Sequence, residues 1–122
     1  MTINNNRLAG IAYLSVDGLP YMLSGDLSYR VSKVTRETLV GQDTVHGYSE
    51  KPEPGFISGT LRDSGSLKLA DFNKMTNVTV TVELANGKTI TGRKMWTVDA
   101  QEVKSMDATF DVRWEGLSVE EV

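Results

Sequence analysis

Apolar and polar residues alternate along several stretches of the chain, which is the period-two pattern of a β-strand with one buried face. The first long stretch covers residues 21–32 and places these apolar side chains on one side: Tyr21, Leu23, Leu27, Tyr29 and Val31. Gly25, in the middle of this stretch, is typical of a bend or bulge. The turn sequence Asp17-Gly18 separates it from an earlier segment, residues 10–16. We therefore expect a β-hairpin near the N-terminus.

The same alternation returns in the second half of the chain. Residues 78–84 and 90–98 flank Asn86-Gly87, a strong hairpin signal. Two further strands are expected over residues 56–62 and 108–115. Between them, helical spacing predicts one short helix that ends near Thr76-Asn77 and carries Leu69, Phe72 and Met75 on one side. The residues expected to be buried on the apolar faces include Leu27, Val80, Trp96, Phe110 and Trp114.

These patterns predict a mainly β fold with about six strands. We expect two packed antiparallel sheets, a β-sandwich or partly open barrel, with one short flanking α-helix. The 122 residues are enough for a single domain with its own core. Within this domain, residues 1–9 are expected to form an N-terminal arm and residues 117–122 a short acidic C-terminal tail.

The alternation is lost between residues 33 and 55, where two prolines, three glycines and charges of both signs occur. We expect a long irregular loop here. Loops of this length without secondary structure are uncommon in compact domains and are usually functional or disordered. The apolar residues of this loop have no periodic partner within the chain, so their burial is expected to come from another molecule.

Composition narrows the possible chemistry. The chain has no cysteine and one histidine, which excludes disulfide scaffolds, thiolate metal sites and histidine-rich metal sites. Its 16 acidic and 13 basic residues give a net charge of −3, which argues against a general nucleic-acid binder. No apolar run approaches the roughly 20 residues that span a bilayer, and the N-terminus lacks a secretory signal pattern. We therefore expect a soluble protein made in a cytoplasm.

Few residues are candidates for chemistry. His46 would need an orienting carboxylate to act as a general base, and Asp43 lies three residues away. A polar residue in a loop, or an assembly contact, is an equally simple interpretation of His46. Asp99, Glu102 and Asp107 lack the order of a calcium loop and indicate a solvated acidic loop. Phosphate-binding glycine motifs do not occur in the sequence. We expect no enzymatic activity, no cofactor and no metal.

Four segments resemble a known family. They are residues 36–43 with 46–52, residues 77–92, residues 96–104 and the closing Phe110-Asp-Val-Arg-Trp-Glu-Gly116. Across nearly the whole chain, from about Gly10 to Gly116, the sequence resembles the tail tube proteins of Mu-like, contractile-tailed bacteriophages. The type VI secretion tube protein is similar in fold to this family.

The resemblance implies a structural virion protein. Family members form hexameric rings that stack into a hollow tube inside a contractile sheath, and strands of neighbouring subunits join into one barrel around the bore. The expected partners are further copies of the chain and the tail sheath, tape measure, baseplate and tail terminator proteins. Phage DNA would pass through the tube without specific binding. Assembly would take place in the host cytoplasm, with no membrane involved for the free subunit.

Two groups of residues are expected to serve assembly and the bore. The assembly loop, residues 33–55, would contact a neighbouring subunit through Val34, Arg36, Glu37, Leu39, Val40, Gln42, Asp43, Val45, His46 and Tyr48. The polar strand faces supply candidates for the lumen wall, among which the sequence does not choose: Ser24, Asp26, Ser28, Arg30, Ser58, Thr60, Thr91, Arg93, Thr97, Thr109, Asp111 and Arg113.

Two other readings of the sequence remain open. The chain could be a monomeric β-sandwich binding module that engages a protein partner through its long loop. It could also be a small β-barrel enzyme, although the sequence shows no convergent acid/base pair.

Overall fold

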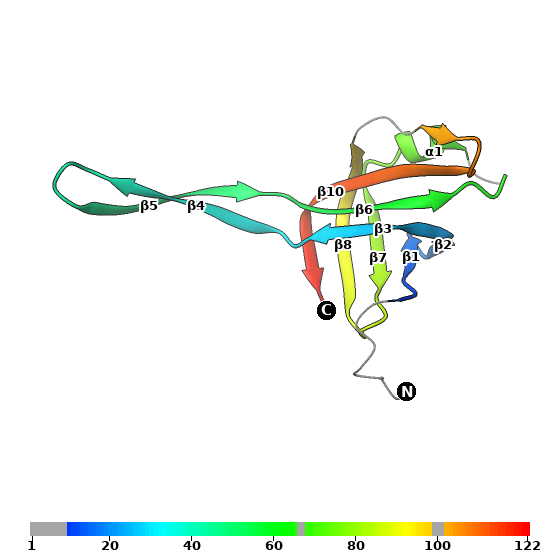
Figure 1. Ribbon diagram of the computed structural model, residues 1–122, viewed down its shortest axis with the longest axis horizontal. Coiled ribbons are helices and arrows are strands. Elements are labelled where there is room, and N and C mark those ends of the chain that lie inside the picture. Colours follow the sequence, from blue (N-terminus) through cyan, green and yellow to red (C-terminus); the bar gives the residue numbers. More distant parts are fainter. Residues whose placement is uncertain (1–9, 66–67, 99–101) are drawn as a thin grey trace.

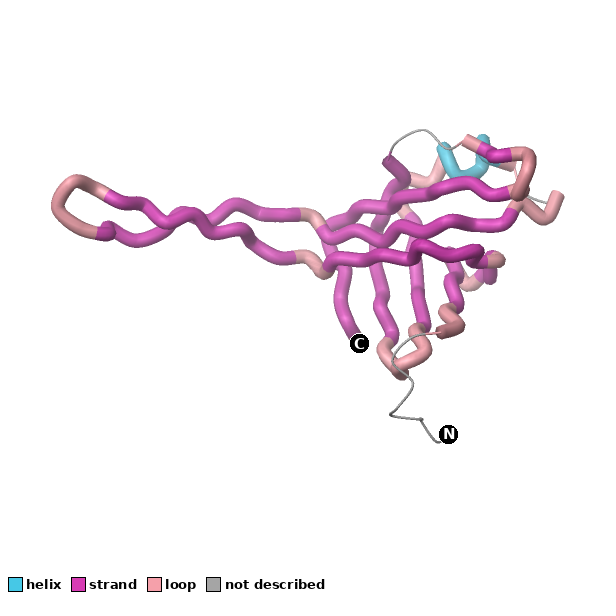
Figure 2. The backbone as a smooth tube through the Cα atoms, viewed as in Figure 1, coloured by secondary structure: helices cyan, strands magenta, loops and turns pink. Residues whose placement is uncertain are grey.

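The structure is a computed structural model that describes residues 10–65, 68–98 and 102–122 (Figures 1 and 2). Its elements in chain order are β1 (Tyr13–Val16), β2 (Leu19–Tyr21), β3 (Leu23–Arg30), β4 (Lys33–Val40), β5 (Val45–Glu53), β6 (Gly55–Arg62), α1 (Leu69–Asn73), β7 (Val78–Glu83), β8 (Thr89–Val98), β9 (Val103–Lys104) and β10 (Thr109–Glu121). The mainly β prediction is confirmed, with more strands than the six that the sequence indicated.

One antiparallel sheet forms the body, in the order β2-β1-β7-β8-β10-β6-β3, with β9 added beside β10. Strand β10 connects the two halves of this sheet, because its residues 109–116 pair with β6 and its residues 113–121 pair with β8. Figure 1 shows β10 running along β6 and then turning to follow β8. The sheet therefore folds over on itself into a nearly closed barrel around one core.

Both halves of the sheet and the helix contribute to this core. Val80, Val82 and Ile90 come from the β7–β8 half, and Ile57, Leu61, Phe110, Val112 and Trp114 come from the β6–β10 half. Phe72 of α1 packs edge-on against Phe110, with ring centroids 5.2 Å apart. The carbonyls of Phe72 and Met75 accept hydrogen bonds from Thr97, so the helix is fastened to β8. Burial of Val80, Phe110 and Trp114 confirms these members of the predicted core.

Several local predictions are confirmed as well. Asp17 and Gly18 have φ angles of 51° and 84° and form the turn of the β1–β2 hairpin. The second strand of this hairpin is the short β2, whereas most of the predicted strand, residues 21–32, forms β3 and pairs with β6 instead. The pairing of β3 with β6 shifts register on both sides of Gly25, as expected of a bulge. At Asn86-Gly87, the Gly87 N–H donates to the Leu84 carbonyl at 3.1 Å and closes the β7–β8 turn. The helix is present but ends at Asn73, earlier than predicted.

The prediction that Trp96 is buried was wrong, because β8 contains a bulge. Val80 pairs with Gly92 but Val78 pairs with Met95, so β8 has one residue more than β7 between these pairs. Lys94 has a φ of 53°, in the left-handed region. The extra residue reverses the alternation, so that Met95 is fully buried and Trp96 lies half-buried on the other face. Leu27 is also only half-buried, since it lies on the edge strand β3 next to the Gly25 bulge.

Two segments predicted to be irregular are strands. Residues 33–53 form a long hairpin, β4–β5, with a ladder from Lys33↔Glu53 to Val40↔Val45. Residues 117–121, expected as a tail, continue β10 beside β8. The buried Val119 fixes this end, because its side chain fills the space where a Cβ of Gly55 would lie, 2.6 Å away.

We expect Phe110→Ala and Trp114→Ala each to lower the free energy of unfolding by about 3–5 kcal/mol, because each leaves a large cavity in the core. Trp96→Ala is the matched control. It should cost less than about 2 kcal/mol, because half-burial contributes only part of the transfer free energy. Urea unfolding followed by fluorescence gives all three values. An equal loss for Trp96 and Trp114 would contradict the bulge and the altered alternation that it causes.

Candidate functional site

The β4–β5 hairpin, residues 33–53, projects from the body and is called the arm below. It continues the directions of β3 and β6 well beyond the barrel (Figures 1 and 2). Every residue of β4 is exposed, and so is every residue of β5 except Glu53. A two-stranded ribbon alone in water is marginally stable, since it buries almost no apolar surface. The arm is therefore a surface that another molecule can cover.

The register divides the arm into an apolar and a polar face, because residues directly opposite each other point to the same side. Val34↔Pro52, Thr38↔Tyr48 and Val40↔Val45 lie on one face. Arg36 and Glu50 lie among them, with Arg36 Nε 3.6 Å from Glu50 Oε1 and its guanidinium 5.7 Å from the Tyr48 ring centre. The other face is polar apart from Leu39 and carries Lys33, Thr35, Glu37, Ser49, Lys51 and Glu53.

A cluster of polar contacts holds the base of the arm. Arg30 Nη1 lies 3.1 Å from Glu53 Oε1, and Arg30 Nε and Nη2 donate to the Pro54 carbonyl at 3.2 and 2.8 Å. The Thr35 hydroxyl donates to Glu53. This hydrogen bond, followed by the charges of Arg30 and Lys33, holds the pKa of Glu53 below its usual value. These contacts fix the direction in which the arm leaves the barrel.

The tip of the arm is also a built structure. The Gly41 N–H donates to the Thr44 carbonyl at 2.9 Å, and His46 Nε2 lies 2.9 Å from Asp43 Oδ1. The imidazole occupies the space beside Gly41, where a Cβ would lie 2.3 Å from His46 Cε1. Its hydrogen bond lowers the pKa of Asp43. The predicted proximity of His46 and Asp43 is thus present, in a role that organises the turn.

A second surface is the outer face of β3, β6 and β10, called the polar sheet face below. On it the Thr60 hydroxyl donates to Asp111 Oδ1 at 2.6 Å, and Arg113 Nε lies 3.3 Å from Glu115 Oε2. Arg113 and Arg30 both lie against the Phe56 ring, at 3.9 and 4.9 Å from its centre. The arginines of this face are thus held by neighbouring carboxylates, carbonyls and an aromatic ring.

Arg62 closes one end of this face, where it donates to the Asp107 carbonyl at 2.7 Å and lies 3.3 Å from the Ser24 hydroxyl.

Most of the candidate lumen residues gather on the polar sheet face: Ser24, Ser28, Arg30, Ser58, Thr60, Asp111 and Arg113. Thr91 and Arg93 lie apart from them, on the outer side of β8. Thr109 also lies on the polar sheet face, opposite Arg62 and in the same hollow as Thr60 and Asp111, but it is only 7% exposed. One candidate lies elsewhere: Thr97 donates to the Phe72 carbonyl under the helix. The side chain of Asp26 lies outside the described part of the structure.

Sequence reasoning missed several residues of these surfaces. Thr38 and Pro52 share the apolar face of the arm with Val34 and Tyr48, which becomes visible only through the strand register. The alternation Val34, Arg36, Thr38, Val40 was a usable signal for β4. Phe56 was assigned to a strand, but its position between two arginines depends on the pairing of β3, β6 and β10.

The described residues contain no cluster of three or more His, Asp or Glu side chains that could hold a metal ion. Within the same residues no helix has the length and apolar character to cross a membrane.

The comparisons with known proteins agree with this architecture. Residues 5–121 match the family described as phage tail tube protein, so the chain belongs to that family. The tail tube protein of Escherichia phage Mu is 26% identical over 94 residues, which cover 77% of this chain and 79% of that protein. The resemblance to Mu-like tail tube proteins that the sequence indicated is therefore confirmed.

Two solved structures share the fold, both from an extracellular contractile injection system, PVC, in its extended state. One is a sheath/tube terminator, with a TM-score of 0.60 and 12% identity over 91% of this chain and 92% of the other. The other is a sheath–tube complex, with a TM-score of 0.60 and 11% identity over 91% and 87%. The chain is thus a member of the phage tail tube family and a structural component of a virion, and it shares its fold with components of a contractile injection system.

We expect Gly41→Ala to displace His46, because the added methyl group would overlap its ring. The pKa of Asp43 should then rise towards its ordinary value. In the native arm the pKa of Asp43 is lowered. The His46–Asp43 contact therefore stabilises the tip fully at pH values above the ordinary pKa of aspartate. This stabilisation is lost as the pH falls through the lowered pKa of Asp43.

A carboxyl NMR titration of Asp43 measures the shift. Gly25→Ala, at a glycine with open space around it, serves as the control and should leave Asp43 unchanged. An unaltered Asp43 titration in Gly41→Ala would show that the tip does not depend on this close approach.

Proposed function

We propose that this protein assembles into stacked hexameric rings that form the inner tube of a contractile phage tail, the conduit through which DNA is ejected. The observation that carries this proposal is the arm, a regular hairpin with an exposed apolar face and no partner for that face among the described residues. Membership of the tail tube family supports it.

The arm is the proposed main assembly contact. The side chains available to a neighbouring subunit are the apolar Val34, Val40, Val45 and Tyr48 with Arg36, and the tip residues Gln42, Asp43 and His46 set the register. Leu39 and Glu37 on the other face would serve a further contact. The arm is a hairpin that buries almost no apolar surface, so it is marginally stable in the free subunit and can open. Restricting these openings on assembly costs conformational entropy, which would keep free subunits soluble until a baseplate template starts the tube.

The polar sheet face is the proposed wall of the bore. Strands β3 and β6 of this face continue directly into the arm (Figure 1). If the arms reach along the axis of the tube, these two strands also run along the tube axis. Arg30 and Arg113 on this face are paired with Glu53 and Glu115 and lie against Phe56. Arg62 at the end of this face contacts the Asp107 carbonyl and the Ser24 hydroxyl. DNA carries one negative charge per about 1.7 Å of axis, so a wall whose arginines are largely paired with carboxylates would hold it less tightly than a wall of free cations.

The remaining partners follow from this role. The tube would be enclosed by the sheath, filled by the tape measure protein before ejection, started at the baseplate and closed by a tail terminator. Fold likeness to a sheath–tube complex and to a sheath/tube terminator of an injection system supports contacts of this kind.

Electron microscopy of concentrated protein tests the proposal directly, and we expect six-fold rings or tubes. A deletion of residues 38–49, bridged by a short glycine linker, should leave a folded monomer that forms neither, because the distal arm is absent. Circular dichroism and unfolding measurements check that the barrel is intact. Polymerisation of the deletion variant would place the assembly contact elsewhere, with residues 2–7 as the next segment to test.

Hydrogen exchange adds a second measurement on the intact chain. The arm amides from Glu37 to Tyr48 should exchange rapidly in the monomer and slowly in the tube. Equal, strong protection in both states would contradict ordering on assembly. A discrete monomer at high concentration that binds another protein through its arm would favour the binding-module alternative.

We expect Asp111→Lys combined with Glu115→Lys to slow or block DNA passage while rings still assemble, because both changes leave cations unpaired on the polar sheet face. Asp26→Lys is expected to add to this effect. Asp111→Asn with Glu115→Gln is the control that removes the negative charges without adding positive charge, since the amide oxygens can still accept hydrogen bonds. Retention of DNA by purified tubes, measured against salt concentration, reports the outcome. Unchanged DNA passage in the lysine variant would show that another face lines the bore.

A further inference from the structure

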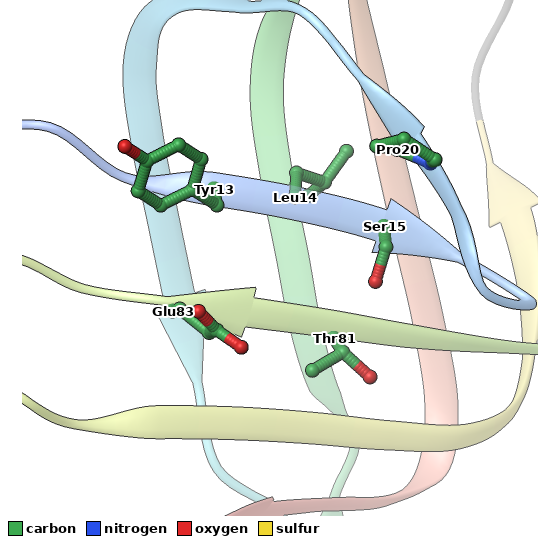
Figure 3. A pocket seen from close by; sticks show the side chains of 6 residues that line it. All are labelled: Tyr13, Leu14, Ser15, Pro20, Thr81 and Glu83. Atoms are coloured by element: carbon green, nitrogen blue, oxygen red, sulfur yellow. The ribbon is translucent and has the colours of Figure 1, made fainter.

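A shallow groove lies on the outer side of β1, β2 and β7, away from the polar sheet face. It has a volume of about 280 Å³ and is lined by Tyr13, Leu14, Ser15, Pro20, Thr81 and Glu83 (Figure 3). Tyr13 pairs with Glu83 and Ser15 with Thr81 across β1 and β7, so each pair lies on one face of the sheet. The groove is therefore a built feature of the sheet, with a carboxylate at one end.

Exposed apolar side chains line part of this groove. Tyr13 is 64% exposed, and Pro20, which lies opposite Ser15, is also exposed. Glu83 is exposed as well. Exposed apolar groups concentrated in one place and accompanied by polar residues mark interaction surfaces. The chain therefore has two such surfaces, this groove and the apolar face of the arm.

The two surfaces cannot meet within one molecule. Figure 1 shows the arm leaving the body on one side and the β1–β2 hairpin on the opposite side. A contact between them therefore requires two copies of the chain. Such a contact is head-to-tail, since each copy uses a different surface, and repeated head-to-tail contacts generate rings or open helical assemblies.

We propose that the apolar face of the arm of one subunit docks on the β1–β2–β7 groove of a second copy of this chain. This inference rests on the proposed function and names the receiving surface for the arm. Tyr48 supplies the aromatic anchor, and aromatic residues and arginines dominate the binding energy of protein interfaces. The groove is large enough to receive one such side chain.

Charge supports this pairing. Arg36 is the cation on the apolar face of the arm and lies beside Tyr48, and Glu83 is the carboxylate among the described residues that line the groove. Arg36 already contacts Glu50 through Nε, but a guanidinium has five N–H donors and can hold a second carboxylate. Docking thus pairs Arg36 with Glu83 while the apolar groups around both are buried.

The size of the contact explains why free subunits need not associate in pairs. The eight residues of β4 span about 26 Å at 3.3 Å per residue. A ribbon of that length and about 10 Å in width covers roughly 260 Å², whereas a stable interface buries about 800 Å² on each partner. One arm in one groove is therefore a weak contact, and several made together in a ring become strong.

Disulfide trapping tests the inference, because the chain has no cysteine of its own. One variant carries Thr38→Cys on the apolar face of the arm and the other carries Ser15→Cys in the groove. Mixed under assembly conditions and oxidised, they should give a cross-linked heterodimer. The matched control replaces Thr38→Cys with Ser49→Cys, an isosteric change on the polar face of the arm. We expect at least about tenfold less product from the control.

A further change probes the charge pair in the same assay. Glu83→Lys in the Ser15→Cys chain should reduce the cross-linking yield several-fold, because it places a second cation against Arg36. Glu83→Gln should reduce it less.

The outcomes separate the docking inference from the proposed function. Tubes visible by electron microscopy, with no Thr38–Ser15 product above the Ser49 control, would overturn the docking inference and leave the tube function standing. Absence of rings and tubes in the unmodified protein would overturn both. Equal cross-linking yields with and without the Glu83→Lys change would overturn the pairing of Arg36 with Glu83.

Discussion

The corner where β10 passes from one half of the sheet to the other holds the whole molecule together. Three glycines make this corner possible. A Cβ on Gly92 would lie 2.1 Å from Met95 Sδ, and one on Gly116 would lie 2.9 Å from Met95 Cγ. Gly55 admits Val119 in the same way. The Met95 side chain therefore fills the inside of the bend, in space that is free because Gly92 and Gly116 have no side chains. Strand β10 can then pair with β6 and β8 in succession.

The arm depends on this arrangement because it continues strands that β10 holds in place. Strand β6 is paired with β10 along its full length and with β3 on its other side, so the two strands that feed the arm are set in a rigid sheet. Arg30 then connects the end of β3 to Glu53 and Pro54 at the end of the arm. A long ribbon without a core thus acquires a fixed direction from the barrel that carries it.

The sequence allowed the fold class, the two hairpin turns and most of the core to be predicted, because the alternation of apolar residues is strong in residues 78–84 and 110–114. It failed at Trp96, where one additional residue in β8 reversed the alternation and nothing in the composition of the strand announced the bulge. Gly and Pro residues concealed the arm, since Gly47 and Pro52 are poor strand formers that an exposed ribbon tolerates. The grouping of lumen candidates followed only from the pairing of β3, β6 and β10.

The two edges of the sheet affect how well free subunits stay soluble at high concentration. Strand β2 has only three residues and contains Pro20, which lacks an N–H donor. Strand β3, the opposite edge, changes register twice around Gly25 and so offers no even row of donors and acceptors. Irregular and proline-containing edges are poor templates for unrelated strands. When many copies accumulate in a cell, these two sheet edges therefore resist aggregation by nonspecific strand pairing. A partner strand whose register matches the same irregularities can still pair with them.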